Sequence, residues 1–206
     1  HSLTKYIGGH GTSIGGIVVD GGNFDWTKNR KRQPLLNEPD QSYGGAVWID
    51  AVPQLTGANI PFVIRLRVVL LRDTGAPLAP FNAWQIIQGL ETVGLRMKQH
   101  CSNAEKVVTF LETQKKVQNV IYPTNHQGEI KERALKYMKG GYGSLVGMDV
   151  GTKENGAKFI DNLKMLYHVA NIGDARSLAI HPATTTHSQL NEKELLAAGV
   201  TPGYVR

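Results

Sequence analysis

Cysteine is nearly absent from this sequence. Its 206 residues hold a single one, Cys101, so no internal disulfide can form, and a zinc site built on several cysteines is excluded. A lone thiol suits a reducing compartment, which predicts a cytoplasmic protein. Long apolar runs are missing as well: none approaches the roughly 20 residues that a membrane span requires, so we exclude a spanning protein.

Aromatic residues are scarce where the charge is concentrated. The chain has a net charge of +6, and its densest basic cluster is Lys28–Arg32, which is short and contains no aromatic side chain. Proteins that bind single-stranded nucleic acid interleave aromatic and basic residues, so we expect no nucleic-acid partner. The spacing of His181 and His187 does not match a helical zinc motif, and we expect no metal.

The first third of the chain contains one continuous apolar run and a long polar stretch. The run 14–19 lacks alternation, which predicts a central strand covered on both faces. Residues 23–60 are rich in Asn, Asp, Pro and Gly, and we expect them to be irregular. A helix is predicted over 62–73, ended by the turn-forming residues 74–77.

A long amphipathic helix is predicted from Pro80, because proline is tolerated in the first turn. Apolar residues then recur every three or four positions: Ala83, Ile86, Leu90, Val93, Met97, Cys101, Ala104, Val108 and Leu111. Because Cys101 lies on this stripe, we expect it to be structural rather than catalytic.

Short strands and helices alternate after Lys116, which predicts an α/β or α+β arrangement with helices on one face. We expect strands at 117–122, 144–150 and 177–180, and helices at 129–138, 155–164 and 192–198.

The residues that can do chemistry gather near the two ends of the sequence. Near the start, Ser2 and Thr4 offer hydroxyls to an anion, Lys5 offers an amine, and glycines follow that allow close backbone approach to a ligand. The run matches neither a Walker nor a Rossmann pattern. These residues alone leave two interpretations open: a lysine that attacks a carbonyl, or a surface lysine before a tight turn.

The polar stretch 171–187 surrounds a short predicted strand, and Arg206 ends the sequence. Arginine binds carboxylates through two parallel hydrogen bonds, but a lone arginine is usually solvated. Asn171 and Thr186 are polar candidates that ordinary turn hydrogen bonding would also explain.

Taken together, the motifs resemble the pyridoxal-phosphate-dependent enzymes of cysteine and methionine metabolism. The resemblance covers the whole chain in order, and Ala79 stands where that family commonly has a serine. The segments that carry it are SLTKY with GGH at 2–10, the helix at 80–96, NIGD at 171–174, HPATTTH at 181–187, and GVTPGYVR at 199–206.

The resemblance implies a fold and a set of roles. The fold would be α/β, the C-terminal part of a fold-type I transferase, with 1–100 finishing the large cofactor domain and starting the interdomain helix. Residues 101–206 would be the smaller C-terminal domain, incomplete at its end. By resemblance, Lys5 holds pyridoxal 5'-phosphate covalently, and Ser2 and Thr4 bind its phosphate. Arg206 would bind the substrate carboxylate, with Asn171 beside it. Thr186 would lie near Lys5 and help to place it.

Within that family the sequence is most similar to the O-acetylhomoserine sulfhydrylases, because related γ-lyases usually carry serine where this chain has Asn171. The implied reaction replaces the acetate of O-acetylhomoserine with sulfide or a thiol, giving homocysteine or methionine, in a homotetramer. Two alternatives remain: a γ-lyase that cleaves methionine or cystathionine, and a non-catalytic binding module.

The family's portion before the lysine motif, which supplies further cofactor contacts, has no counterpart in this sequence. We therefore expect a fragment that is inactive alone and that associates through the apolar run at 14–19.

Overall fold

The computed structural model describes all residues, 1–206, and the chain divides into two compact units. We call His1–Ser2 with Gly15–Ala83 the first unit, and Leu3–Ile14 with Trp84–Arg206 the second unit. Strands occur together with helices, so the predicted α/β class is confirmed. No single helix is both long and apolar enough to cross a membrane, although two successive helices bent by 99° (48–56 and 61–74) together reach that length and apolarity.

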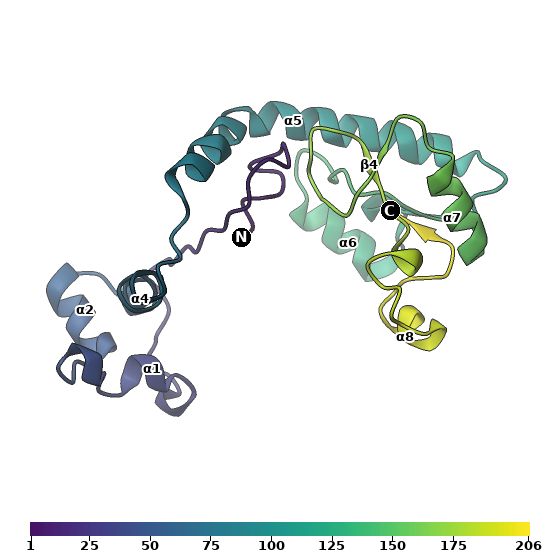
Figure 1. Ribbon diagram of the computed structural model, residues 1–206. Coiled ribbons are helices and arrows are strands. Elements are labelled where there is room, and N and C mark those ends of the chain that lie inside the picture. The colour runs from purple at the N-terminus through teal and green to yellow at the C-terminus, as the bar shows by residue number, and fades with distance from the viewer. The chain divides into compact units, whose positions relative to one another are not determined.

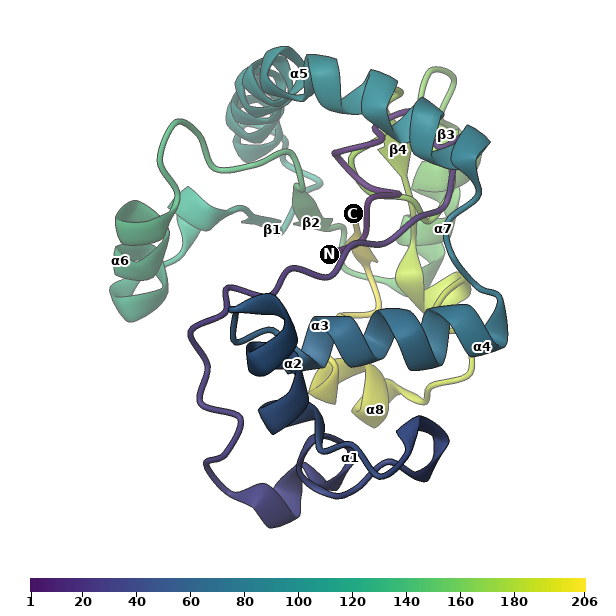
Figure 2. The same cartoon turned by 90° about the vertical axis from the view of Figure 1, so that its left-hand side faces the viewer.

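The first unit is helical. Pro34 and Pro61 occupy the first turns of α1 and α3, where a missing N–H costs nothing. The predicted helix at 62–73 is confirmed, since α3 runs through the π-helical η3 into α4 as one continuous rod (Figure 2). Its elements are η1 (Arg30–Arg32), α1 (Pro34–Asn37), η2 (Gln41–Tyr43), α2 (Trp48–Thr56), α3 (Pro61–Arg65), η3 (Leu66–Leu71) and α4 (Arg72–Thr74).

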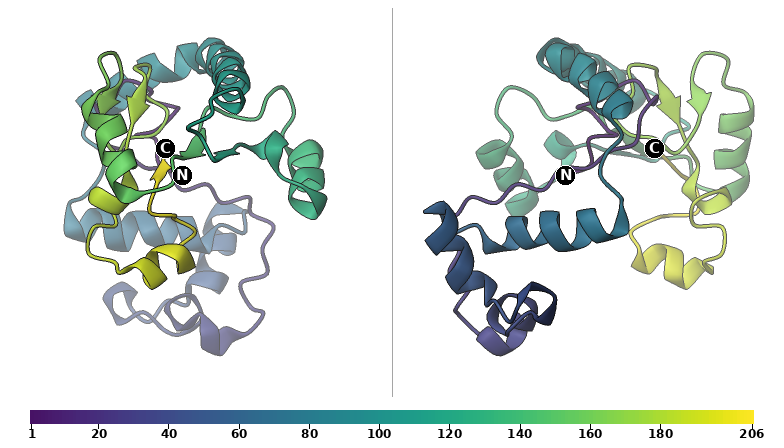
Figure 3. Two further views of the ribbon diagram at one scale, coloured as in Figure 1. Left: turned by 90° about the vertical axis from the view of Figure 1, so that its right-hand side faces the viewer. Right: turned by 60° about the vertical axis from the view of Figure 1, so that its left-hand side comes forward.

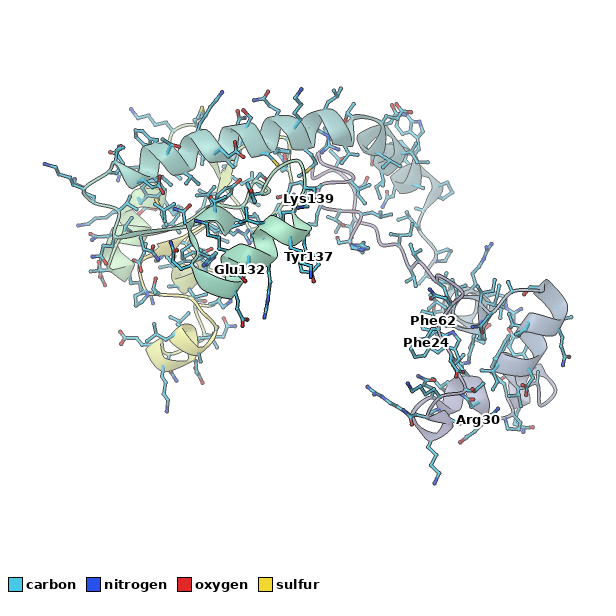
Figure 4. The ribbon with its side chains drawn as sticks, turned by 180° about the vertical axis from the view of Figure 1, so that it is seen from behind. Phe24, Arg30, Phe62, Glu132, Tyr137 and Lys139 are labelled. Carbon is cyan, nitrogen blue, oxygen red and sulfur yellow. The ribbon has the colours of Figure 1, made fainter.

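A small core holds these helices together. Its buried members come from α1 and α2: Leu36, Trp48, Ile49 and Val52. At the edge of this core Trp26 stacks on Phe62 with ring centroids 5.3 Å apart and meets Phe24 edge-on at 4.6 Å. Figure 4 shows Phe24 and Phe62 close together.

Two sequence predictions for the first third of the chain are wrong. The run 14–19 is not a buried strand: its only ladder contact is an isolated bridge between Ser2 and Gly16, and Val19 is 77% exposed. Ile17 also exchanges backbone hydrogen bonds with His1, but these contacts do not extend into a strand ladder, so apolar composition alone does not make the run a strand. The stretch 23–60 is not wholly irregular either, because it contains α1 and α2. Pro53 lies inside α2, and a proline within a segment argues against a helix when only the sequence is considered.

The long helix α5 (Pro80–Glu112) spans 33 residues and confirms the periodic pattern (Figure 1). The buried positions include Ile86, Cys101, Ala104 and Val108, so the thiol is a core group, as predicted. Leu90 is an exception on the expected stripe, because its side chain is 51% exposed.

A three-stranded antiparallel sheet forms the centre of the second unit. Its order is β1 (Asn119–Ile121), β2 (Gly147–Asp149), β5 (Tyr204–Val205), with Val120 opposite Met148 and Met148 opposite Val205. A parallel pair, β3 (Tyr167–His168) and β4 (Leu178–Ala179), lies beside it. The other elements are η4 (Pro123–Asn125), α6 (Gly128–Tyr137), α7 (Lys153–Asp161), η5 (Pro182–Thr184) and α8 (Glu192–Ala197).

The helices of this unit begin where the sequence supplies caps. Thr152 accepts a hydrogen bond from the amide of Asn155 at the start of α7, and Asn191 with Glu194 forms a capping box at the start of α8. Figures 2 and 3 show α6 at the β1 side of the sheet and α7 at the other side. All the strands and helices expected after Lys116 are found, and the two-residue strands β3 and β5 are additional.

Candidate functional site

Lys5 lies in a tight turn of the second unit. The amide of Gly8 donates to the carbonyl of Leu3 at 2.9 Å, and the amide of Gly9 donates to the carbonyl of Lys5 at 2.7 Å. Gly9 has φ +69°, and a Cβ on Gly8 would lie 2.9 Å from the Leu3 oxygen, so this turn requires both glycines. The glycines that follow the lysine in sequence therefore serve to fix its backbone.

The amine of Lys5 is held by Asn171. Lys5 Nζ donates to Asn171 Oδ1 at 3.3 Å, and both side chains are half-buried. This partner is a neutral amide, and no carboxylate pairs with the lysine. A neutral amide thus holds the amine in place, and lysine amines are the side-chain groups that form Schiff bases with carbonyls.

Asp174 orients the amide of Asn171. Asn171 Nδ2 lies 3.4 Å from Asp174 Oδ2, which directs the amide nitrogen to the carboxylate and leaves the amide oxygen for Lys5. Asp174 is itself buried, and it accepts the backbone amide of Arg176 at 2.9 Å and the guanidinium through Nε and Nη2 at 3.1 and 2.9 Å. These bonds to Arg176 lower the pKa of Asp174 to about 2.

Arg206 reaches the same asparagine from another element. It follows β5 and exchanges backbone hydrogen bonds with Ile180, just after β4, at 2.9 and 3.0 Å. Its Nη2 donates to the main-chain oxygen of Asn171 at 3.1 Å. Only this one nitrogen is occupied, so Nε and Nη1 stay free for a carboxylate.

The Lys5 turn and the 171–176 loop pack on each other. The amide of Ala175 donates to the carbonyl of Gly9 at 2.7 Å, and a Cβ on Gly173 would lie 2.6 Å from the Tyr6 nitrogen. Figure 1 shows the N-terminal turn, in purple, beside the green loop that leads to β4. This contact brings the amine and the guanidinium to one residue, Asn171.

A hollow of about 460 Å³ opens next to Asn171 and Arg206. Its polar lining includes Asp174, Arg176 and His100, and its apolar lining comes from α5, β2 and β4. His100 Nε2 is buried without a hydrogen-bond partner, and burial, followed by the nearby Arg96 charge, lowers the pKa of the ring. The hollow is thus lined by Arg206, by the Arg176–Asp174 ion pair and by a histidine whose pKa is lowered.

Three further predicted site residues, Ser2, Thr4 and Thr186, make no contact with Asn171 or Arg206 among the hydrogen bonds described above. Ser2 belongs to the first unit, where it pairs with Gly16, and Thr4 follows in the turn that holds Lys5. Thr186 is exposed, and its hydroxyl shares a 2.8 Å hydrogen bond with His187 Nδ1. The phosphate-binding roles of Ser2 and Thr4, and the place of Thr186 near Lys5, stay predictions.

His181, the other histidine of that stretch, is a core residue. It is fully buried, its Nε2 donates to the carbonyl of Pro202 at 2.8 Å, and its Nδ1 is 2.9 Å from Thr184 Oγ1. Both ring nitrogens are therefore used in holding η5 against the approach to β5.

Sequence reasoning missed two residues around Lys5. Arg96 donates from α5 to the carbonyls of Tyr6 and Ile7, and the Tyr6 hydroxyl lies 2.8 Å from Ser144 Oγ. A signal existed for Arg96, because a charged residue between the stripe positions Val93 and Met97 calls for a buried partner.

Comparison with known proteins gives consistent matches over the whole chain. The family model described as "Cys/Met metabolism PLP-dependent enzyme" matches residues 1–206. The O-acetyl-L-homoserine sulfhydrylase of Leptospira meyeri is 48% identical, and the homocysteine synthase of Schizosaccharomyces pombe is 42% identical. In both cases the alignment covers 100% of this chain and 47% of the relative, so the chain spans about half the length of these curated relatives.

A solved structure agrees with these matches. The crystal structure of a Campylobacter jejuni protein assigned as an O-acetylhomoserine (thiol)-lyase is 39% identical and superposes with a TM-score of 0.83. This chain is covered completely, against 48% of the crystallised chain, which carries N'-pyridoxyl-lysine-5'-monophosphate.

Proposed function

Since the chain belongs to the Cys/Met metabolism PLP-dependent enzyme family and has its fold-type I architecture, we propose that Lys5 is the lysine that binds pyridoxal 5'-phosphate. We further propose that the whole protein replaces the acetate of O-acetylhomoserine with sulfide or a thiol, as a step of methionine biosynthesis. The names of the relatives support this reaction, and Asn171 favours it over γ-lyase chemistry.

One observation carries the proposal: Asn171 contacts both the amine of Lys5 and the guanidinium of Arg206. The residues fit the cofactor, because the amine is half-buried, has no carboxylate partner and projects from a turn that two glycines hold rigid. An amino-acid substrate needs a cation for its carboxylate close to the covalent centre, and Arg206 supplies it.

The roles of the residues follow from this geometry. Bound pyridoxal phosphate supplies an electron sink for carbanionic substrate. Arg206 binds the α-carboxylate through its free nitrogens, while Asn171 keeps the Lys5 amine beside that carboxylate site. With its amine free, Lys5 removes and returns protons at the substrate's Cα and Cβ, so that acetate leaves Cγ and sulfide or a thiol takes its place.

The remaining assignments extend this proposal. Ser2 and Thr4 bind the cofactor phosphate, and Thr186 helps to place Lys5. Residues 1–100 end the large cofactor domain, and 101–206 form the C-terminal domain. The whole protein acts in the cytoplasm, which is consistent with its lone Cys101. It acts as a homotetramer, which is consistent with the exposed apolar side chains of Ile14 and Val19.

Borohydride trapping of pyridoxal phosphate on the 206-residue chain tests the proposal. We expect an absorbance band near the visible edge and, after reduction and peptide mass spectrometry, a cofactor-sized mass concentrated on Lys5. Lys98, exposed on α5, is the internal control, because surface lysines react with any aldehyde. Labelling spread evenly over all lysines would contradict the assignment of Lys5.

The reaction class is tested separately, on the whole protein. Incubation with O-acetylhomoserine and sulfide is expected to give homocysteine and acetate. Release of an α-keto acid without added sulfide would instead identify a γ-lyase, and no turnover of either kind would favour a binding module.

A further inference from the structure

The turn that carries Lys5 rests on α5. Its own amides close the turn, as Gly8 and Gly9 donate to Leu3 and Lys5. The carbonyls of Tyr6 and Ile7 are not used in this closure and point to the helix, where both meet the same side chain.

That side chain is Arg96. Its Nη1 donates to the Tyr6 oxygen at 2.8 Å and its Nη2 to the Ile7 oxygen at 3.1 Å. The guanidinium is fixed on its own helix as well, through Nη2 to the Gly89 oxygen at 2.7 Å and Nε to Thr92 Oγ1 at 3.1 Å. A planar guanidinium can hold two successive carbonyls and two helix groups at once, whereas a lysine ammonium is a point donor on a flexible stem.

Two glycines make this contact possible. A Cβ on Gly89 would overlap the Gly8 oxygen, and a Cβ on Gly9 would overlap the Arg96 guanidinium. The helix and the turn therefore meet backbone to backbone, and Arg96 fills the remaining space between them. Arg96 has no carboxylate partner, so neutral groups alone hold its guanidinium: the two turn carbonyls, the Gly89 oxygen and the Thr92 hydroxyl.

We propose that Arg96 is the positioning residue for Lys5. By holding the two carbonyls that follow the lysine, it fixes the backbone from which the Lys5 side chain reaches Asn171. This role rests on the proposed function of Lys5. The contact between Arg96 and the turn carbonyls is a property of the fold, and it is measurable without any cofactor.

The first test measures amide hydrogen exchange at Gly8 and Gly9. We expect Arg96→Met to accelerate this exchange about tenfold, the factor that corresponds to 1.4 kcal/mol. The exchange rate of Arg96→Lys should fall between those of Arg96→Met and the unmutated chain. Exchange along α5 at Ala104 and Val108 should stay unchanged. The matched control is Lys98→Met, which removes the same charge from the exposed side of the same helix and should have no effect.

The second test measures how much borohydride-trapped pyridoxal phosphate falls on Lys5 as a fraction of all labelled lysines. We expect Arg96→Met to lower this fraction about tenfold and Arg96→Lys to restore part of it. Thr92→Val, which removes only the hydroxyl that receives Nε, should shift both readouts slightly in the same direction. If Arg96→Met does not fold, Arg96→Lys and Thr92→Val decide the question.

The outcomes separate the two proposals. If the unmutated chain takes no label at Lys5, the cofactor role of Lys5 is contradicted. The exchange rates at Gly8 and Gly9 still test whether Arg96 holds the turn. Label at Lys5 that is unchanged in the Arg96 variants overturns the positioning role. Exchange that rises equally at Gly8, Ala104 and Val108 also overturns it, because Arg96 would then serve only general stability.

Discussion

The amine of Lys5 and the side-chain oxygen of Asn171 lie 3.3 Å apart although 166 residues separate them in sequence. Asn171 in turn receives Arg206 on its main-chain oxygen at 3.1 Å. One residue therefore fixes the amine through its side chain and the guanidinium through its backbone, which makes the two contacts separable by mutation.

Replacing Asn171 by leucine tests the first contact. Asn171→Leu removes the acceptor for Lys5 and keeps the backbone oxygen for Arg206. Because a hydrogen bond of this kind contributes about 1 kcal/mol, we expect roughly fivefold less trapped pyridoxal phosphate on Lys5. Asn162→Leu, an exposed asparagine after α7, is the matched control. Equal labelling of the two variants would mean that Asn171 does not hold the amine.

The stability of the chain is expected to depend on Asp174 at acidic pH. Its pKa is lowered from 3.8 to about 2, first by the hydrogen bond from Arg176, so the unfolded carboxyl binds a proton before the folded one does. The carboxylate therefore contributes its full stabilisation above about pH 4 and loses it as the pH falls towards 2, a loss of about 2 kcal/mol.

Urea unfolding at pH 7 and pH 2.5 measures this contribution. The original chain should lose about 2 kcal/mol more than Asp174→Asn between the two pH values, because the other carboxyls titrate alike in both. Asp161→Asn, at the exposed end of α7, should behave like the original chain. The same pH dependence in Asp174→Asn and the original chain would contradict the assignment.

Two glycines of α5 should respond oppositely to alanine. Gly89→Ala places a methyl group against the Gly8 oxygen, and we expect it to destabilise the chain by about 1–3 kcal/mol. Gly94→Ala meets open space, so it should stabilise the helix by about 0.5–1 kcal/mol. Thermal unfolding of both variants checks the sign; similar shifts for the two would disprove the close approach at Gly89.

Substitution of His181 should cost more than that of any exposed histidine. His181→Ala leaves a cavity and removes the side-chain donor to Pro202 O, and we expect a loss of about 3 kcal/mol. His168→Ala, on exposed β3, should change the unfolding free energy by less than about 0.5 kcal/mol. A small effect at position 181 would show that the ring is not part of the core.

The apolar run at 14–19 should promote self-association of the chain. Val19 is 77% exposed, so Val19→Lys is expected to leave the unfolding free energy within about 0.5 kcal/mol and to reduce association at high concentration. Sedimentation velocity over a concentration series measures the second effect. A loss of several kcal/mol would instead place Val19 in a core.

The local sequence pattern was sufficient to predict an element where its buried residues recur with a regular period or where turn residues mark its ends. The stripe from Ile86 to Val108 predicted α5, and turn residues bounded the strands β1, β2 and β4. The run 14–19 failed because a strand also needs a neighbour, and apolar composition does not say whether one exists. Pro53 concealed α2 because proline inside a helix normally ends it.

The site was predictable only in part, for a similar reason. Lys5, Asn171 and Arg206 were identified through their motifs, and the structure brings these three together. The position of Arg96 on the α5 stripe indicated a buried partner, but its carbonyl partners lie 89 and 90 positions away and only the structure identifies them. Asp174 lies within the quoted NIGD segment, and the structure adds that its carboxylate orients the Asn171 amide. The roles of Ser2, Thr4 and Thr186 remain predictions from resemblance.

The separation of Lys5 from Asn171 has a consequence for the order of folding. Closing a loop of 166 residues costs chain entropy of about 4–5 kcal/mol, whereas α5 forms from neighbouring residues. The helix should therefore appear early, and the pairing of amine and amide late. During refolding, selective chemistry at Lys5 would emerge after the helical signal, so the lysine reports when the second unit has finished folding.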